Sequence, residues 1–193
     1  MTQSMRTVAA ILLLSSLVSA PALAQQVWRA ATEYPATAMP GEGLARFARL
    51  VGEATKGRLV VEPGYDGPDG LKSSGIPGAV QAGKIAVGDA FGGALTGIDP
   101  VFQIATLPFL ATSLEQARAL HDAARSKYEA AFVRQGQILL YTTPWPPSGL
   151  WTREPVTTTA ALQGLAIRTY DATSTTVLRD AGAMPVELSF GDT

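Results

Sequence analysis

The 193-residue sequence contains no cysteine and only one histidine. Without cysteine the chain cannot form a disulfide, and it cannot carry the lipid that lipoproteins attach to a cysteine at their cleavage site. The single histidine, His121, has no cysteine or second histidine with which to share a metal ion, so we expect no metal site. It is also the only imidazole that could activate a nucleophile, and no G-x-S-x-G segment is present. These absences argue against a hydrolase and against a metalloenzyme.

The sequence also lacks a block of basic residues and, after residue 24, a long apolar run. Its 15 Lys and Arg residues nearly balance its 16 Asp and Glu residues, which gives a net charge of −1. Nucleic-acid-binding proteins concentrate positive charge on one face, so we expect no nucleic-acid partner. A membrane-spanning helix needs roughly 20 apolar residues. We therefore expect no direct membrane anchor after residue 24.

The first 24 residues are typical of a cleavable secretion signal. Arg6 and the amino terminus are positively charged, and residues 8–18 are apolar except for two serines. Pro21 breaks this run, and Ala22-Leu23-Ala24 fits the small-x-small pattern of a cleavage site. The apolar run is too short for a permanent anchor helix, which needs roughly 20 residues. We therefore predict export across the inner membrane, cleavage after Ala24 and a periplasmic mature protein.

After the signal segment the sequence alternates between short strands and amphipathic helices. Gly57 and Gly136 are suitable helix-terminating residues, and Ser113 is a suitable N-cap for a long helix. The predicted strands are residues 27–31, 58–62, 85–90, 137–141, 150–152, 165–170 and 185–190, and the predicted helices are residues 44–56, 76–82, 114–135, 160–163 and 174–181, with a loop over residues 35–43. Repeated strand-helix units predict an α/β fold with mostly parallel sheets, in which ligands bind beyond the carboxyl ends of the strands.

Two segments have some features of cofactor or metal sites. Gly41-Glu42-Gly43 lies between a predicted strand and a predicted helix, as a dinucleotide fingerprint does, but Arg46 occupies the position of its third glycine. Residues 66–70 (DGPDG) lack the alternating ligand spacing of a calcium loop, and a turn explains them better. We therefore expect no nucleotide, no other cofactor and no calcium ion.

Arg168 is the residue that most strongly suggests a ligand site. It interrupts an otherwise apolar predicted strand, where a guanidinium is costly unless an anion meets it. Its planar fork can hold a carboxylate through two hydrogen bonds. An ion pair with an internal Asp or Glu would also account for an arginine here, and so would exposure on an edge strand. Upstream, Trp145 and Trp151 flank a proline-rich segment, and rigid aromatic side chains of this kind either wall an apolar pocket or pack in a core.

Three stretches of the sequence match motifs of a known family. They are residues 97–102 (GIDPVF) followed by 107–110 (LPFL), residues 162–168 (LQGLAIR), and residues 182–186 (GAMPV) leading to Phe190. The order and spacing of these stretches are more specific than any one of them. By these residues the chain resembles the solute-binding proteins of tripartite ATP-independent periplasmic (TRAP) transporters, of the DctP type.

The resemblance implies a periplasmic binding-protein fold with two α/β lobes and a ligand cleft between them. The first lobe would comprise residues 25–142, and residues 143–193 would be the first part of a second, incomplete lobe. The arginine that matches Arg168 would clamp the carboxylate of the ligand. The other residues expected to line the cleft are Tyr34, Phe91, Gly92, Trp145, Trp151 and Phe190.

The implied function is that of an extracytoplasmic solute receptor, not an enzyme. It would bind a small organic acid anion and deliver it to the small and large membrane permease subunits of a TRAP transporter. Sialic-acid-binding members carry a further arginine near residues 145–149, where this sequence has Trp, Pro, Pro, Ser and Gly, so we expect a smaller or more apolar carboxylate. Two alternatives stay open: an exported α/β hydrolase-like enzyme that uses His121 as its base, and a carboxylate sensor with the same cleft but no transport role.

Overall fold

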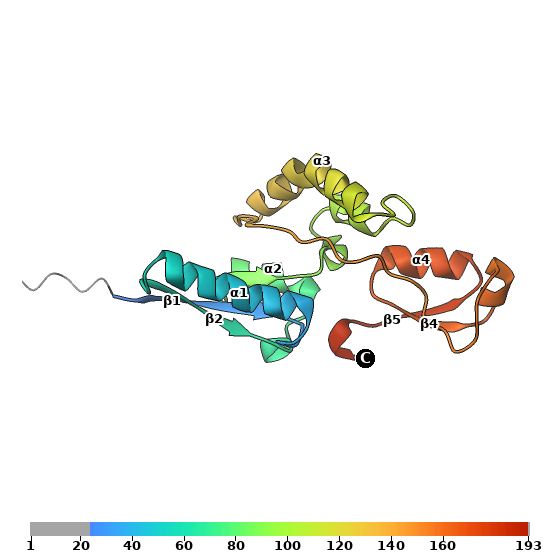
Figure 1. Cartoon of the computed structure of the whole chain (residues 1–193), viewed down its shortest axis with the longest axis horizontal. Helices are drawn as coiled ribbons and strands as arrows, with labels where there is room; N and C mark the ends of the chain where they lie inside the picture. The colour runs from blue at the N-terminus through green and yellow to red at the C-terminus, as the bar shows by residue number, and fades with distance from the viewer. Residues whose placement is uncertain (1–23, 193) are drawn as a thin grey trace, which may run out of the picture.

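The computed structural model describes residues 24–192, which form two parallel β-sheets with helices packed against them (Figure 1). The predicted signal segment, apart from Ala24, lies outside the described residues. Both sheets contain only parallel strand pairs, which confirms the predicted α/β class. Among residues 24–192, no helix combines the length and the apolar character that crossing a membrane requires.

The first sheet is built around a central strand. β1, Gln26–Thr32, lies between β2, Leu59–Gly64, and β3, Val87–Asp89, and it is parallel to both. In the register of the sheet, Thr32 at the end of β1 stands beside Asp89 at the end of β3. The carboxyl ends of the strands therefore meet at one edge, which is where parallel sheets bind their ligands.

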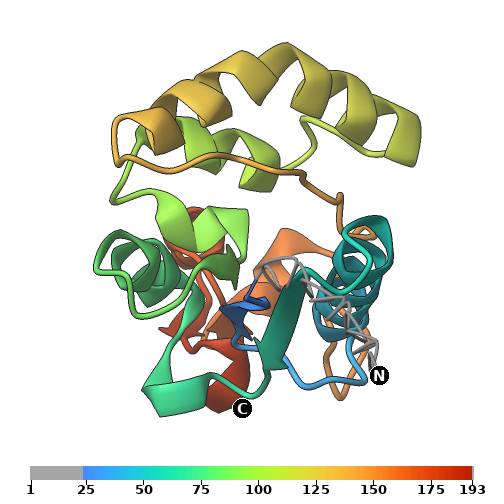
Figure 2. The ribbon, with the colours of Figure 1, turned by 90° about the vertical axis from the view of Figure 1, so that its left-hand side faces the viewer.

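Helices cover both faces of this sheet (Figure 2). α1, Met39–Ala54, packs over Ala30 of β1, and α2, Ile76–Gln81, packs over the next residue, Ala31. Successive residues of a strand point to opposite faces, so the two neighbouring alanines meet different helices. Short 3₁₀ helices, Pro68–Gly70 and Ser73–Gly75, precede α2.

α1 begins earlier than the sequence predicts. The prolines and glycines of residues 35–43 indicate a loop, whereas the helix already starts at Met39. Pro40 lies in the first turn, where the missing N–H of a proline costs no hydrogen bond, and Glu42 in the same turn is favoured by the helix dipole. The predicted loop is therefore wrong from residue 39 onward, because these residues start a helix rather than break one.

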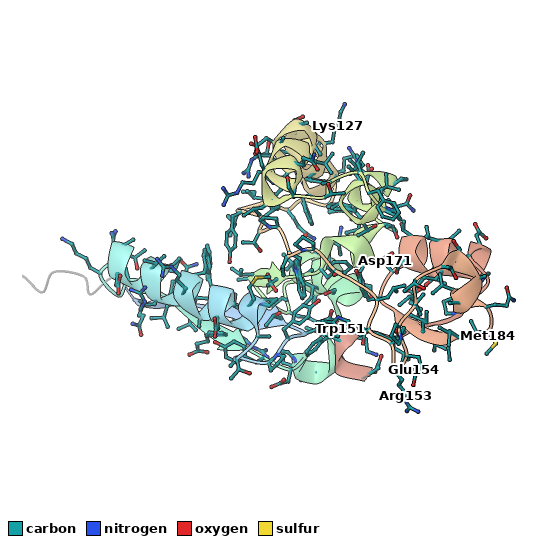
Figure 3. All side chains as sticks on the ribbon, turned by 45° about the vertical axis from the view of Figure 1, so that its right-hand side comes forward. Lys127, Trp151, Arg153, Glu154, Asp171 and Met184 are labelled. Carbon is teal, nitrogen blue, oxygen red and sulfur yellow. The ribbon has the colours of Figure 1, made fainter. Side chains whose placement is uncertain are left out.

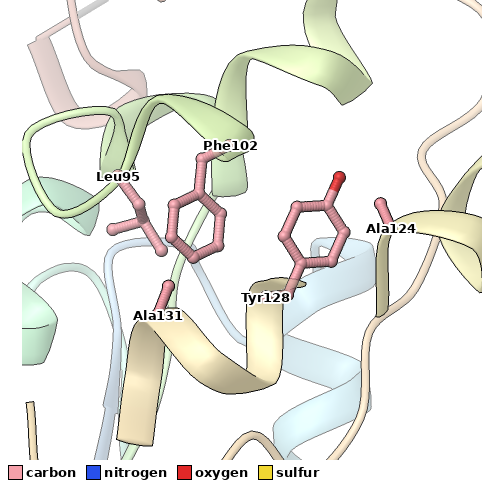
Figure 4. Close-up of a cluster of buried hydrophobic side chains, with 5 residues drawn as sticks. All are labelled: Leu95, Phe102, Ala124, Tyr128 and Ala131. Atoms are coloured by element: carbon pink, nitrogen blue, oxygen red, sulfur yellow. The ribbon is translucent and has the colours of Figure 1, made fainter. Parts of the chain in front are cut away.

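α3, Leu114–Val133, forms a separate apolar cluster with the segment before it. Ser113 caps this helix as predicted, with its hydroxyl accepting a hydrogen bond from the N–H of Gln116. The buried side chains of the cluster are Leu95, Phe102, Ala124, Tyr128 and Ala131 (Figure 4). They attach α3 to two 3₁₀ helices, Gly92–Leu95 and Pro100–Thr106, that follow the first sheet.

The second sheet is a single strand-helix-strand unit. β4, Ala166–Thr169, pairs in parallel with β5, Met184–Glu187, and α4, Ala172–Asp180, connects them. Asp171 caps α4, because its Oδ1 accepts a hydrogen bond of 2.7 Å from the N–H of Ser174. Short 3₁₀ helices, Thr159–Leu162 and Phe190–Asp192, precede and follow this unit.

The segment between α3 and the second sheet differs from its prediction. The apolar sequence of residues 137–141 and 150–152 predicts two strands, but the structure has no strand there. β-propensity alone gives only extended chain, because a strand needs a neighbour for its backbone hydrogen bonds. No other strand of residues 24–192 pairs with this segment, which runs along α3 before it reaches the second sheet (Figure 2). Both strand predictions are therefore wrong.

Two glycines near the start of α1, Gly41 and Gly43, test how closely this helix approaches the loop before it. A β-carbon at Gly41 would overlap the carbonyl oxygen of Pro35 and would lie 2.9 Å from the Cα of Ala36. We expect Gly41→Ala to lower the free energy of unfolding by about 1–3 kcal/mol through overpacking. Gly43→Ala is the matched control, because a β-carbon there meets no atom within 4 Å.

The control substitution should raise the free energy of unfolding by up to about 1 kcal/mol, since alanine is the better helix former. Urea unfolding followed by circular dichroism measures both variants. Equal effects at the two positions would contradict the close approach of α1 to its preceding loop.

Candidate functional site

Polar residues gather where β1 and β3 end. Thr32 is the last residue of β1, Glu33 and Tyr34 follow it, and Asp89 ends β3. The Thr32 hydroxyl donates a hydrogen bond of 2.9 Å to Oδ2 of Asp89, and it accepts one of 3.3 Å from the N–H of Tyr34. Glu33 is only 8% exposed and Tyr34 only 5%. The end of the sheet thus holds two carboxyl groups and a phenol close together.

The carboxylate of Glu33 connects three loops at this edge. Its two oxygens accept hydrogen bonds from the hydroxyl of Ser73 at 2.8 Å and from the N–H of Ser73 at 3.0 Å. The same hydroxyl accepts a hydrogen bond of 2.9 Å from the N–H of Phe91. Ser73 lies in a loop after β2 and is almost completely buried. These bonds satisfy a buried polar group and fix the loops after β1, β2 and β3 relative to one another.

Five aromatic side chains lie near these carboxyl groups, four from segments that follow the strands of the two sheets and one from the segment that connects the sheets. The ring of Tyr34 has its centroid 5.5 Å from that of Trp145 and 5.0 Å from that of Phe190. The ring of Phe91 lies 6.2 Å from Trp145 and 5.4 Å from Tyr170. Tilted and edge-to-face contacts at such distances are favourable. These five residues, which we name the aromatic cluster, join the first sheet, the connecting segment and the second sheet.

Arg168 stands beside the aromatic cluster on the second sheet. It lies in β4, and its guanidinium carbon is 5.5 Å from the centre of the Tyr170 ring. Its Nε donates a hydrogen bond of 3.0 Å to the carbonyl of Leu188. No Asp or Glu of residues 24–192 forms an ion pair with it, so an internal ion pair does not explain this arginine within that part of the chain. The side chain is exposed and can meet an anion from outside.

The charges on the two sides of the aromatic cluster both act on Tyr34. Burial raises the pKa of its hydroxyl far above the ordinary value, and the charge of Glu33, the hydrogen bond to Glu33 and the charge of Asp89 raise this pKa further. The positive charge of Arg168 lowers the same pKa. The phenol of Tyr34 is therefore subject to negative charge from the first sheet and to positive charge from the second.

The surroundings of Asp89 disfavour the ionised form of its carboxyl group. Burial raises the pKa of Asp89, the hydrogen bond from Thr32 offsets part of this rise, and the charge of Glu33 raises the pKa further. Within residues 24–192, neither Asp89 nor Glu33 forms an ion pair with a Lys, Arg or His. The first sheet thus presents an anionic wall to the aromatic cluster.

The structure brings together most of the residues that the sequence singles out. Those in or beside the aromatic cluster are Tyr34, Phe91, Trp145, Phe190 and Arg168. Gly92 follows Phe91 at the start of a 3₁₀ helix. Trp151 does not join them: its side chain is 96% exposed, on the connecting segment that has no strand partner in the described chain (Figure 3).

Four residues of this site do not stand out in the sequence: Glu33, Ser73, Asp89 and Tyr170. Asp89 could have been found by the argument that identifies Arg168, because it is also a charge at the end of an apolar predicted strand. Glu33 and Ser73 are 40 residues apart, and no local pattern connects them. Their contact follows only from the way the sheet brings separate loops to one edge.

His121 lies apart from this site, on α3. Its Nδ1 is 3.1 Å from Oδ1 of Asp122, and its Nε2 contacts the hydroxyl of Thr142. None of these residues belongs to the aromatic cluster. Across residues 24–192, no group of three or more His, Asp and Glu side chains is placed to hold a metal ion. The arrangement therefore gives no support to a hydrolase that uses His121 as the base at the end of the sheet.

A surface hollow of about 390 Å³ lies elsewhere on the molecule. It is lined by Arg29, Asp69, Leu71, Lys84 and Ile85, none of which belongs to the aromatic cluster. Its ion pair, Arg29 with Asp69 at 3.8 Å, is largely exposed, and exposed pairs of this kind contribute little. We therefore place the candidate ligand site at the aromatic cluster, where charge, rings and strand ends coincide.

Solved structures with a similar fold include several solute receptors. DctP6, a Bordetella pertussis extracytoplasmic solute receptor binding pyroglutamic acid, is 28% identical, with a TM-score of 0.81 over 86% of this chain and 55% of that one. A TRAP solute-binding protein from a marine metagenome, specific for pyroglutamate, is 32% identical, with a TM-score of 0.81 over 87% of this chain and 55% of that one. A TRAP solute-binding protein from Sulfitobacter, with bound β-D-galacturonate, shares the fold at 18% identity and a TM-score of 0.72 over 86% of this chain and 56% of that one.

This chain thus spans about 55% of the length of the receptors that it matches. No curated protein matches its sequence. The model of a protein family described as bacterial extracellular solute-binding protein, family 7, matches residues 30–193, which includes both sheets. The family and these structural neighbours are solute receptors rather than enzymes. The protein therefore belongs to the DctP family of bacterial extracellular solute-binding proteins.

Proposed function

We propose that this protein is an extracytoplasmic solute receptor of a TRAP transporter. It captures a small organic acid anion beside the aromatic cluster and delivers the acid to the small and large membrane permease subunits. The observation that carries the proposal is the position of Arg168, a guanidinium set against aromatic rings with no acidic partner in residues 24–192. An arginine in such a position gains most from an incoming carboxylate.

The geometry around Arg168 suits a carboxylate held from one side. Its Nε is already bonded to the carbonyl of Leu188, which fixes the side chain and leaves the terminal nitrogens of the fork to the ligand. The ring of Tyr170 beneath the guanidinium restricts it further through a cation–π contact. A side chain held in this way loses little entropy when the ligand arrives, which favours affinity.

The aromatic cluster supports a small and partly apolar acid. Rings of Tyr34, Phe91, Trp145 and Phe190 would exclude water from the body of the ligand, while the charged groups orient it. Pyroglutamate, a flat cyclic monocarboxylate, has these properties. It is the ligand of two neighbours with 28% and 32% identity, so we take it as the first ligand to test.

We propose that residues 25–142 form one lobe of the receptor and that residues 143–193 form part of a second. Three contacts between these regions support a closure around the ligand. They are the ion pair of Lys72 with Asp192, the ring contact of Phe91 with Tyr170 and that of Tyr34 with Phe190. Each joins a loop at the end of the first sheet to a residue that follows β4 or β5. The loaded, closed form would be the one that the permease recognises.

We further propose a periplasmic location, with signal cleavage after Ala24. Protein exported by a Gram-negative host should therefore have an intact mass that corresponds to a chain beginning at Gln25, because Ala22-Leu23-Ala24 presents small residues at both recognised positions. Ala24 is exposed ahead of β1, so the bond after it is accessible. Ala24→Arg should block cleavage and leave the precursor mass, whereas Ala24→Ser should be processed normally. A mature mass that begins at another residue would contradict the proposed site.

Arg168→Ala should weaken the binding of pyroglutamate about ten- to a hundred-fold, because a charge-assisted hydrogen bond to a carboxylate contributes roughly 1.5–3 kcal/mol. Arg168→Lys should recover only part of the affinity, since lysine lacks the planar fork. Isothermal titration calorimetry measures both. Arg179→Ala is the matched control, because it removes the same charge from the exposed last turn of α4.

The melting temperature of each variant shows whether it remains folded. Affinity that survives Arg168→Ala in a folded protein would overturn the role assigned to this arginine. If Arg168→Ala also left the affinity for every other organic acid tested unchanged, the main support for a carboxylate receptor would be lost.

A further inference from the structure

The anionic wall on the first sheet contains one carboxylate oxygen that nothing in the described chain uses. Asp89 binds the Thr32 hydroxyl through Oδ2 at 2.9 Å, and its Oδ1 accepts no hydrogen bond from residues 24–192. Asp89 is only partly buried, and its Oδ1 is not one of the fully buried side-chain atoms that lack a partner. Its place at the end of β3 is the edge at which parallel sheets bind ligands.

Glu33, the other acid of this wall, has a different position. Each of its oxygens accepts a hydrogen bond from Ser73, and the side chain is only 8% exposed. It can contribute negative charge to the site but has little capacity for a further donor. Asp89 is therefore the acceptor of the pair, and Glu33 adds a fixed negative potential beside it.

Arg168 places the opposite charge on the other side of the aromatic cluster. The guanidinium carbon of Arg168 is 5.5 Å from the ring of Tyr170, and that ring lies 5.4 Å from the ring of Phe91, two residues after Asp89. The site thus has a cationic end on β4 and an anionic end on the first sheet, with aromatic rings between them. A ligand that bound Arg168 through its carboxylate and lay along these rings would have its other end near the end of β3, where Asp89 lies.

We infer that Asp89 is a specificity-determining residue, which selects monocarboxylates that carry an N–H donor and, together with Glu33, rejects dicarboxylates. The inference rests on the proposed receptor function. An N–H group at the anionic end would gain a charge-assisted hydrogen bond to Oδ1 of Asp89. A second carboxylate at the same place would meet two like charges, and such repulsion is a common means of excluding a wrong ligand.

The setting of Asp89 is consistent with a binding role rather than a structural one. Burial and the charge of Glu33 raise its pKa above the ordinary value, which means that its ionised form costs stability in the folded protein. Because the folded pKa lies above the unfolded one, this cost is present above the folded pKa and disappears as the pH falls through it toward the unfolded pKa. An uncharged side chain at this position would stabilise the ligand-free protein at neutral pH.

Asp89→Asn tests the inference with three ligands of similar size. The first is pyroglutamate, the second is the lactone analogue that has a ring oxygen in place of the N–H, and the third is glutarate, a dicarboxylate. Asp69→Asn is the matched control, because Asp69 is an exposed acid on the same sheet's loops and contacts no residue of the aromatic cluster. Isothermal titration calorimetry near neutral pH gives the affinities, and thermal unfolding gives the stability of each variant.

The wild-type protein should bind pyroglutamate about ten- to a hundred-fold more tightly than the lactone. In Asp89→Asn this ratio should fall toward one, glutarate should gain affinity about ten-fold or more, and the melting temperature should rise. The control variant should keep the wild-type ratio and affinities. Equal binding of lactam and lactone by the wild type, or an unchanged ratio in Asp89→Asn, would overturn the inference while leaving the receptor function in place. A wild-type protein that binds none of the three acids would overturn both.

Discussion

The hydrogen bonds between Glu33 and Ser73 are the constraint on which the geometry of the site depends. β1 is the central strand of the first sheet, and Glu33, the residue that follows it, is buried rather than exposed to solvent. Burying a carboxylate without donors would cost several kcal/mol, so its position requires the hydroxyl and the N–H of Ser73. The same hydroxyl receives the N–H of Phe91. Tyr34 and Phe91, the rings that the first sheet contributes to the aromatic cluster, therefore owe their positions to this one link.

A separation of charge follows from this arrangement. Glu33 and Asp89 are held at the end of the first sheet, Arg168 is held on the second, and the ring contact of Phe91 with Tyr170 connects the two. Electrostatic interactions are stronger in such a setting than in water. Within residues 24–192, none of the three charges forms an ion pair, although each side chain takes part in hydrogen bonds that hold it in place. The arrangement would stabilise the complex with a polar acid more than the free protein, as a receptor requires.

The features of the molecule that the sequence predicts are those set by local patterns. Alternating strands and helices predict the parallel α/β fold, Ser113 predicts a helix start, and the apolar strand around Arg168 marks this arginine as unusual. Long-range arrangements are not predictable in the same way. The segment of residues 137–152 has the composition of strands but no neighbour in the described chain, and Glu33 and Ser73 meet only because the sheet brings separate loops together. The early start of α1 is hidden because proline in a first turn has the same appearance in a sequence as proline in a loop.

The central claim is that an organic acid lies across the aromatic cluster with its carboxylate on Arg168 and its opposite end toward Asp89. A crystal structure of the protein with bound pyroglutamate tests this most directly. We expect two hydrogen bonds between the ligand carboxylate and the Arg168 guanidinium, with the ring N–H directed at Oδ1 of Asp89. A ligand bound away from the aromatic cluster, or one whose carboxylate does not contact Arg168, would contradict the claim.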